Sequence, residues 1–355
     1  MELYELKAKA KSLLKELIQT PSYSKQEALS ALLIERYLKE SGIPFYRKAN
    51  NVWAKNLHFD PNLPTVLLNS HHDTVRPNSA YTIDPFSALE KDGKIYGLGS
   101  NDAGASLVGL WATFLHYYKE KMAYNLIYAA SAEEEISGVE GIQSILSELG
   151  PISFAIVGEP TEMNLATAEK GLVVFDCTVE GTASHAAHPN DDNSIYNAFK
   201  EIEKVRTMEF KKVSPVLGKV KATVTCVNAG SAHNVVPNQT VFTIDVRTNE
   251  RYSNEEIQEL LENSLNAKVK ARSLRLQASF IDLEHPIVQS AKRMGCKLYG
   301  SPTVSDQALM PFPSVKIGIG DSKRSHSADE YVYEKELFHG IEKYIELFEP
   351  LLLGK

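Results

Sequence analysis

A histidine and an aspartate, separated by one residue, directly follow an apolar stretch of the chain. The stretch 65–68 (Thr-Val-Leu-Leu) is typical of a buried strand, and His71 and Asp73 come just after it. The ends of such strands are where α/β sheets hold ligands. The imidazole could coordinate a metal ion while the carboxylate holds the other ring N–H and sets the tautomer. Because ten histidines are spread through the chain, this pair indicates a metal site only if other ligands accompany it.

Further clusters of acidic or histidine side chains stand where other predicted strands stop or where a helix begins. Carboxylates crowded at one sheet edge repel each other, and partial burial makes such a cluster costly. A divalent cation removes that cost, so the pattern predicts a metal centre. The clusters are Asp102, Glu133 to Glu135, Glu159 and the group Ser325 to Glu330, which contains His326.

The hydrophobic pattern divides the chain into two domains. Strands alternate with helices in residues 1–170 and 281–355, which predicts a discontinuous α/β catalytic domain with a doubly wound, mixed but mostly parallel sheet. Residues 171–280 show two-residue alternation and two helical segments, which predicts a small inserted α+β domain. The strands expected in the insert are 173–179, 219–228, 241–247 and 273–280.

Three local signals concern segments near the clusters. Ser24 and Glu27 have the spacing of a capping box, which predicts that a helix begins there. Asp92-Gly93 predicts a hairpin turn. Asp329 and Glu330 are interpreted either as part of the site or as acids that favour the start of the last helix.

Composition excludes several classes of partner. The 355 residues are 43% hydrophobic, enough for a large core. A net charge of −7 and a pI near 5.9 argue against nucleic acid or an anionic membrane surface as the main partner. We expect no membrane span, and the amphipathic N-terminal pattern lacks the apolar core of a signal peptide. Cys177, Cys226 and Cys296 show no CxxC spacing, so we interpret them as reduced core residues of a cytoplasmic protein.

Five motifs, in order along nearly the whole chain, resemble those of a known enzyme family. This is the zinc-dependent acetylornithine deacetylase and succinyl-diaminopimelate desuccinylase family, which also includes carboxypeptidase G and aminoacylases. Each motif alone is unspecific, but all five in order make the resemblance strong. The motifs are SHHDTV at 70–75, DGKIYGLGSND at 92–102, AEEE at 132–135, GEPTE at 158–162 and HSADEY at 326–331.

The resemblance implies two zinc ions bridged by Asp102, with Co²⁺ or Mn²⁺ as substitutes. His71 and Glu159 would complete one metal site, and Glu135 and His326 the other. A carboxylate that bridges two ions about 3.5–4 Å apart lets them share a water whose pKa falls toward about 7.

The same resemblance implies the remaining roles. Glu134 would be the general base that takes the water's proton and passes it to the leaving amine, and Asp73 would orient the histidine ligand next to it. In the insert, His185 and Asn234 would stabilise the oxyanion, with His185 reaching the site from the partner subunit in dimeric members. Arg247 would grip the substrate's carboxylate. The insert would also act as a lid and form the contact of a homodimer.

Some positions depart from the family pattern. The family commonly has an arginine and a Met-Lys-Gly run around the bridging aspartate, whereas this chain has Leu98 and Ala103-Gly104-Ala105. These departures affect the fine structure of the site more than its chemistry. Lys323 and Arg324 either meet an anionic acyl group such as succinyl or lie in solvent, and solvent is the default for exposed charge.

The resemblance implies a metal-dependent amidohydrolase that removes an acyl group from a small-molecule N-acyl amino acid. The expected substrate is N-acetylornithine, or N-acetyl- or N-succinylcitrulline, in arginine biosynthesis. A dipeptidase or a general aminoacylase needs the same metals and the same carboxylate clamp, so both stay open. A catalytically inactive scaffold is a hypothesis of another class, and the presence of all five ligands and Glu134 argues against it.

Overall fold

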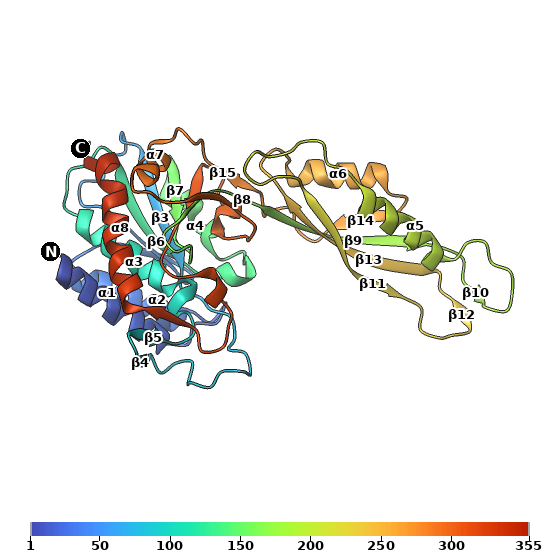
Figure 1. The fold of residues 1–355 in the computed structure, drawn as a ribbon, viewed down its shortest axis with the longest axis horizontal. Helices are drawn as coiled ribbons and strands as arrows, with labels where there is room; N and C mark the ends of the chain where they lie inside the picture. Colours follow the sequence, from blue (N-terminus) through green and yellow to red (C-terminus); the bar gives the residue numbers. More distant parts are fainter. Residues whose placement is uncertain (1, 354–355) are drawn as a thin grey trace. The chain divides into compact units, whose positions relative to one another are not determined.

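The computed structural model describes residues 2–353, and the chain divides into two compact units, both drawn in Figure 1. The main segment of unit 2 overlaps the predicted insert, and the unit also includes a short segment, 300–304, that the prediction placed in the catalytic domain. Unit 1 consists of Met1–Thr167, Phe280–Tyr299 and Ser305–Lys355, and unit 2 of Ala168–Ser279 and Gly300–Val304.

A nine-stranded sheet forms the centre of the larger fold. Its strands are β1 Phe45–Lys48, β2 Asn51–Lys55, β3 Thr65–His71, β6 Asn125–Ser131, β7 Phe154–Val157, β8 Leu165–Glu169, β15 Ser279–Phe280, β16 Leu298–Ser301 and β17 Ser314–Lys316. The order is β1-β2-β6-β3-β7-β17-β8-β15, with β16 paired to β8. The four strands β6, β3, β7 and β17 are parallel, whereas β1, β2 and β8 pair antiparallel. The predicted mixed, mostly parallel α/β sheet is therefore confirmed.

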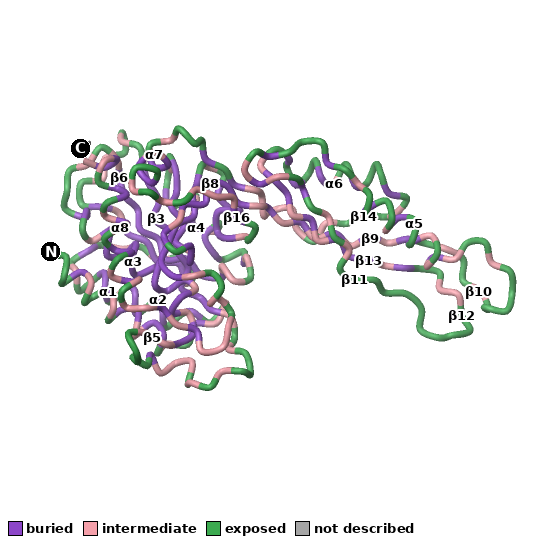
Figure 2. Tube along the Cα trace, in the orientation of Figure 1, coloured by how far each residue is buried: buried purple, intermediate pink, exposed green. Residues whose placement is uncertain are grey.

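Burial follows from this topology. Every residue of β3 is buried, because helices and loops cover both faces of a parallel strand in the middle of a sheet (Figure 2). Helix α3 packs against α1, α8 and β3. Within residues 2–353, no helix combines the length and the apolar character that a membrane crossing requires. The helices of unit 1 are α1 Leu3–Ile18, α2 Ala28–Glu40, α3 Ala105–Tyr117, α4 Ile142–Leu149, α7 Pro286–Arg293 and α8 Glu334–Leu353.

Unit 1 also contains three short strands outside the large sheet and several single helical turns. The predicted hairpin at Asp92-Gly93 is confirmed, because it joins β4 (Glu90–Lys91) to β5 (Lys94–Tyr96) and both turn residues have positive φ, 52° and 71°. Strand β18, Tyr331–Tyr333, pairs with β5. The single helical turns are η1 Ser100–Gly104, η2 Glu134–Ile136, η3 Asp306–Leu309 and η4 Ser322–Arg324.

Unit 2 is a four-stranded antiparallel sheet with two helices. The sheet order is β11-β13-β9-β14, and the two short strands β10 and β12 pair separately. The fourth predicted strand, 273–280, is a strand only at its end, where Ser279–Phe280 form β15 of the large sheet. The fourth strand of this sheet, β14, lies earlier, and Asn254 Nδ2 holds the later segment by donating to the Leu274 and Leu276 carbonyls at 3.0 and 2.9 Å. The elements are β9 Gly171–Glu180, β10 Ser184–His185, α5 Ser194–Thr207, β11 Lys221–Ala229, β12 Val235–Val236, β13 Gln239–Thr248, α6 Asn254–Ser264 and β14 Lys268–Ala271.

The three cysteines differ in burial. All are free thiols, which agrees with their interpretation as reduced residues. Only Cys177 is a core residue, because Cys296 is half-buried and Cys226 is exposed on β11. The expectation that all three lie in the core was therefore wrong.

Candidate metal centre

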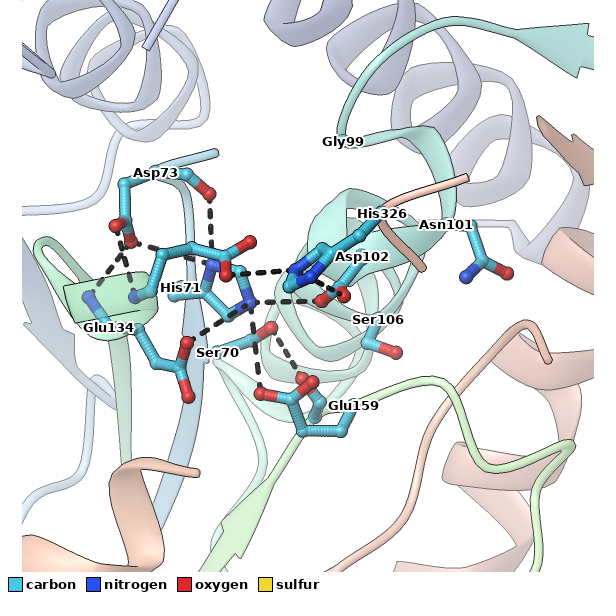
Figure 3. Close-up of polar contacts among 12 residues, drawn as sticks. Ser70, His71, Asp73, Gly99, Asn101, Asp102, Ser106, Glu134, Glu159 and His326 are labelled. Carbon is cyan, nitrogen blue, oxygen red and sulfur yellow. Dashed lines mark hydrogen bonds and ion pairs between the residues drawn. The ribbon is translucent and has the colours of Figure 1, made fainter. Parts of the chain in front are cut away.

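Residues from four neighbouring parallel strands meet at one edge of the large sheet (Figure 3). His71 is the last residue of β3, Glu134 and Glu135 follow β6, and Glu159 follows β7. His326 comes from the loop after β17. Because the carboxyl ends of parallel strands share an edge, residues far apart in sequence are brought together there.

Asp102, from the turn before α3, lies between the two histidines. Its Oδ1 is 3.3 Å from His71 Nε2, and its Oδ2 is 3.6 Å from His326 Nε2. Glu159 Oε1 is 3.7 Å from His71 Nε2, and Glu135 Oε2 is 3.0 Å from His326 Nε2. Each oxygen of Asp102 thus faces a different histidine, as a bridging carboxylate requires.

The donor set fits divalent metal. His71, Asp102 and Glu135 each offer a ligand atom within 4.8 Å of the others, and so do His71, Glu134 and Glu159. Imidazole and carboxylate donors suit Zn²⁺, Co²⁺ and Mn²⁺. These two groups contain four of the five residues that the resemblance assigned as ligands, and His326 joins them through its distances to Asp102 and Glu135. Glu134, which the resemblance assigned as the base, also lies within reach of a cation beside His71.

The electrostatics of the cluster favour positive charge. Burial raises the pKa of Glu159 to about 8 and also raises the pKa of Glu134 well above its usual value. Burial alone would lower the pKa of His71, but the carboxylates around it, Glu134 most of all, raise it well above its usual value. It is costly to ionise these carboxylates together, and the imidazole beside them attracts a proton. A cation bound here would therefore strongly stabilise the ionised carboxylates.

Asp73 connects the histidine to the loop that carries the glutamates. Its side chain is buried, with Oδ1 accepting from the Glu134 backbone N–H at 3.0 Å and Oδ2 from the Glu135 backbone N–H at 3.2 Å. His71 Nδ1 is 2.9 Å from the Asp73 carbonyl oxygen and 3.4 Å from Oδ1. The carboxylate therefore does more than orient the histidine, because it also positions the two glutamates.

Ser24 and Glu27 do not form the predicted capping box. Helix α2 begins after Glu27, whose side chain makes no cap hydrogen bond. Ser24 Oγ instead donates to Asp73 Oδ2 at 2.7 Å, and the Glu27 carboxylate accepts from the backbone N–H groups of Lys25 at 2.6 Å and Glu133 at 3.2 Å. Both residues support the site, a role that the sequence analysis missed because their partners lie 49 and 106 residues away.

Glu330 does not cap the last helix. It is buried, and its carboxylate accepts backbone N–H groups of the turn 99–102. Burial raises the pKa of Glu330 to about 8, and these N–H donors oppose that rise. Asp329 also has another role, because its carboxylate accepts from the backbone N–H groups of Thr82 and Ile83.

The two basic residues before His326 differ in their surroundings. The Arg324 guanidinium forms a two-bond ion pair with Glu336, at 2.6 and 3.0 Å, and lies 4.7 Å from the centre of the Tyr331 ring. Lys323 is exposed. Arg324 is therefore paired within its own unit, with 16% of its side chain exposed, whereas Lys323 lies in solvent.

The three site residues predicted in the insert lie in unit 2. His185 is paired with Val235 across the small β10–β12 sheet, and the Ala186 backbone N–H donates to the Asn234 carbonyl at 2.9 Å. His185 and Asn234 are both exposed and are neighbours within the unit. Their roles in oxyanion stabilisation stay predictions.

Arg247 lies on β13 and pairs with Asp245 of the same strand. Its Nε donates to one carboxylate oxygen at 2.8 Å and its Nη2 to the other at 3.1 Å. This interaction fixes one edge of the guanidinium group. The role of Arg247 as a carboxylate clamp also stays a prediction.

Comparisons with known proteins identify the family to which the chain belongs. Residues 67–349 match the model of peptidase family M20/M25/M40. A probable succinyl-diaminopimelate desuccinylase of Staphylococcus aureus is 25% identical over 81% of this chain and 82% of its own length. The succinyl-diaminopimelate desuccinylase of Pelagibacter ubique is 25% identical over 76% of this chain and 74% of its own length.

Solved structures share the fold. Aminopeptidase PepT of Bacillus cereus superposes with a TM-score of 0.77 at 16% identity and covers 97% of this chain and 98% of its own. The dipeptidase Dug1p of Saccharomyces cerevisiae superposes with a TM-score of 0.63 at 14% identity, over 98% and 97% of the two chains. The family match extends over most of the chain and includes the strand ends where the histidines and carboxylates converge. The chain therefore belongs to peptidase family M20/M25/M40 and is an amide-bond hydrolase with a metal-ligand cluster.

Proposed function

We propose that the protein removes the acyl group from an N-acyl amino acid with a free carboxylate, using two divalent cations, zinc by preference, and Glu134 as general base. The observation that carries the proposal is the placement of Asp102 between His71 and His326, with Glu134 Oε2 3.9 Å from His71 Nε2. The names of two curated relatives add N-succinyl-diaminopimelate to the candidate substrates. N-acetylornithine, or an N-acyl citrulline, stays the prediction from sequence.

Five residues would bind the two cations, and Glu134 would transfer the proton. One cation would be held by His71 and Glu159, and the other by Glu135 and His326. Asp102 would contribute a ligand to both. Such a pair, when bound, lowers the pKa of a shared water and polarises the amide carbonyl. Glu134 would accept the proton of the attacking water and donate it to the amide nitrogen as the carbon–nitrogen bond breaks, so that a neutral amine leaves.

Unit 2 would supply the contacts that select the substrate. His185 and Asn234 would donate hydrogen bonds to the oxyanion. Because Asp245 occupies the Nε and Nη2 side of Arg247, a substrate carboxylate would be bound from the Nη1 side. A clamp of this kind would serve N-acyl amino acids and dipeptides alike, so the choice between them needs an assay.

The deciding experiment is a substrate panel assayed with protein loaded with Zn²⁺ or Co²⁺. The panel holds the N-acetyl and N-succinyl forms of ornithine, citrulline and diaminopimelate, together with dipeptides that have a free amino terminus. We expect kcat/KM for at least one N-acyl amino acid to exceed that for every dipeptide by at least about tenfold, or about 1.4 kcal/mol. Preferred turnover of dipeptides would establish a dipeptidase, and no turnover of any member would indicate an inactive scaffold.

We propose a homodimer formed through β11 and α5 of unit 2. Strand β11 is the edge of its sheet, and an edge strand offers backbone groups for pairing with a second copy. Helix α5 packs over β11 and exposes Tyr196 and Phe199, whose side chains are 67% and 64% accessible. Two large exposed rings beside an open sheet edge are typical of an interface.

Replacing Tyr196 with serine and Phe199 with lysine together should dissociate this dimer. Loss of interface aromatic side chains costs about 2 kcal/mol or more, which is about thirtyfold in the dissociation constant. Sedimentation equilibrium measures the effect. The matched control is Leu260→Lys. Leu260 is also exposed, but its helix, α6, packs over β9 and β14. This substitution should leave the dimer unchanged. A monomeric parent protein would refute the proposal.

A further inference from the structure

The segment 321–330, which carries His326, is tied to the turn that carries Asp102 near both of its ends. At its beginning, Asn101 Oδ1 accepts from the Asp321 backbone N–H at 3.0 Å, and Asn101 Nδ2 donates to the Asp321 carbonyl at 3.1 Å. One side chain thus pairs with both backbone groups of a single residue, as a neighbouring strand would.

At the other end of the segment, Glu330 binds the same turn. One carboxylate oxygen accepts from the backbone N–H groups of Asn101 at 2.8 Å and Asp102 at 2.9 Å, and the other accepts from Gly99 at 3.2 Å. The Gly97 backbone N–H also donates to the Glu330 carbonyl at 2.9 Å. Bonds to a buried carboxylate are strong, and leaving their donors unpaired is costly.

The fit around Asn101 is close. Asn101 is fully buried, and Gly320, just before the segment, has a φ of 101°. A Cβ atom at Gly320 would overlap the Asn101 side-chain oxygen, so a residue larger than glycine would push the amide away. The segment therefore has little freedom to shift relative to the turn.

We propose that Asn101 and Glu330 form a clasp that sets the approach of His326 to Asp102, and with it the affinity of the cation held by Asp102, Glu135 and His326. The inference rests on the proposed function, because it takes these three residues as ligands. The His326 side chain is 54% exposed, so its own packing positions it weakly. The clasp holds the segment to the turn of Asp102 near both ends, in addition to the bond that Asn78 Nδ2 donates to the His326 carbonyl at 3.2 Å. Its two members are positioning residues.

The test measures Zn²⁺ binding to the full-length, chelator-treated protein by competition with a chromophoric chelator. We expect Asn101→Ala and Glu330→Gln each to leave the affinity for one ion as in the parent and to lower the affinity for the second at least about tenfold. Loss of a residue that orients a metal ligand typically lowers metal affinity about 10–100-fold. His326→Ala should weaken the same ion. In the His326→Ala background, Asn101→Ala should add less than about twofold, because the residue it positions is already gone. Ser322→Ala, an exposed change on the same segment, is the matched control and should alter neither ion.

Three results would overturn the clasp while leaving the proposed function in place. The first is that His326→Ala lowers the affinity of the second ion whereas Asn101→Ala and Glu330→Gln do not. The second is that Asn101→Ala keeps its full effect in the His326→Ala background, and the third is that it lowers the affinity of both ions equally. Either of the last two is what a general structural role would produce. If His326→Ala itself changes no metal affinity, the ligand assignment and the clasp both fail. Should Glu330→Gln not fold, Asn101→Ala and Asn101→Ser carry the test.

Discussion

Glutamine in place of Glu134 should abolish measurable turnover while two ions still bind. The substitution keeps the size of the side chain but removes the carboxylate that would accept the water's proton, and a general base contributes about 10²–10⁴-fold to the rate. The side chain has only 12% of its surface exposed, beside His71, so bulk water cannot easily replace it as proton acceptor. The measurements are kcat on the best substrate of the panel and the zinc content per chain.

The neighbouring acid gives a matched control for this substitution. Glu133 is also buried, but its carboxylate points back to its own loop, where it accepts from the Glu140 backbone N–H at 3.4 Å. Glu133→Gln should therefore keep kcat within a few-fold of the parent. If Glu134→Gln loses an ion, Glu134 is a ligand and the base must be another group. If it retains both ions and full activity, the proposed mechanism is wrong.

The central sheet and the cluster could be predicted because both follow from local patterns. Apolar runs such as 65–68 and 154–157 became parallel neighbours, and their carboxyl ends necessarily share one edge. Once the strands were recognised, His71 and Glu159 had to lie near each other. The sequence also showed which side chains could use that edge, since histidine and carboxylate are the donors that divalent metals accept.

The residues that hold the ligands in place could not be predicted in the same way. Ser24 and Glu27 have the types and spacing of a helix cap, and only the folded chain shows that their partners are Asp73 and Glu133. Glu330 is equally plausible as a helix cap until the turn at 99–102 is seen to surround it. A polar side chain with a local use and a distant use has the same sequence signature in both cases, so the distant use becomes visible only in three dimensions.

The wrong strand in unit 2 has a related cause. The stretch 273–280 alternates as a strand should, but Asn254 at the start of α6 takes up two of its carbonyl groups. Period-two alternation shows which faces of a segment are apolar, and it does not show whether another strand is available to pair with it. The hydrogen bonds from Asn254 at the start of α6 therefore outweigh the local preference of 273–278 for a strand.

Asparagine in place of Asp73 should reduce metal affinity and catalysis together, in contrast to glutamine at position 134. Asparagine has one acceptor oxygen where aspartate has two, so one of the backbone N–H groups of Glu134 and Glu135 would face an amide N–H. An unpaired buried donor costs about 1–3 kcal/mol. Because the affected loop carries one predicted ligand and the predicted base, we expect zinc affinity to fall about 10–100-fold and kcat to fall even at saturating zinc.

Comparing the two measurements identifies what Asp73 does. If it only orients His71, excess zinc should restore kcat, because the defect would be one of affinity alone. If it also positions the glutamates, kcat should stay low when both ions are bound, since the base is displaced. Ser24→Ala removes one bond to the same carboxylate and leaves both backbone bonds, so it should cause a smaller change in the same direction. A normal kcat and normal zinc affinity in Asp73→Asn would show that the loop holds its shape without the second acceptor oxygen.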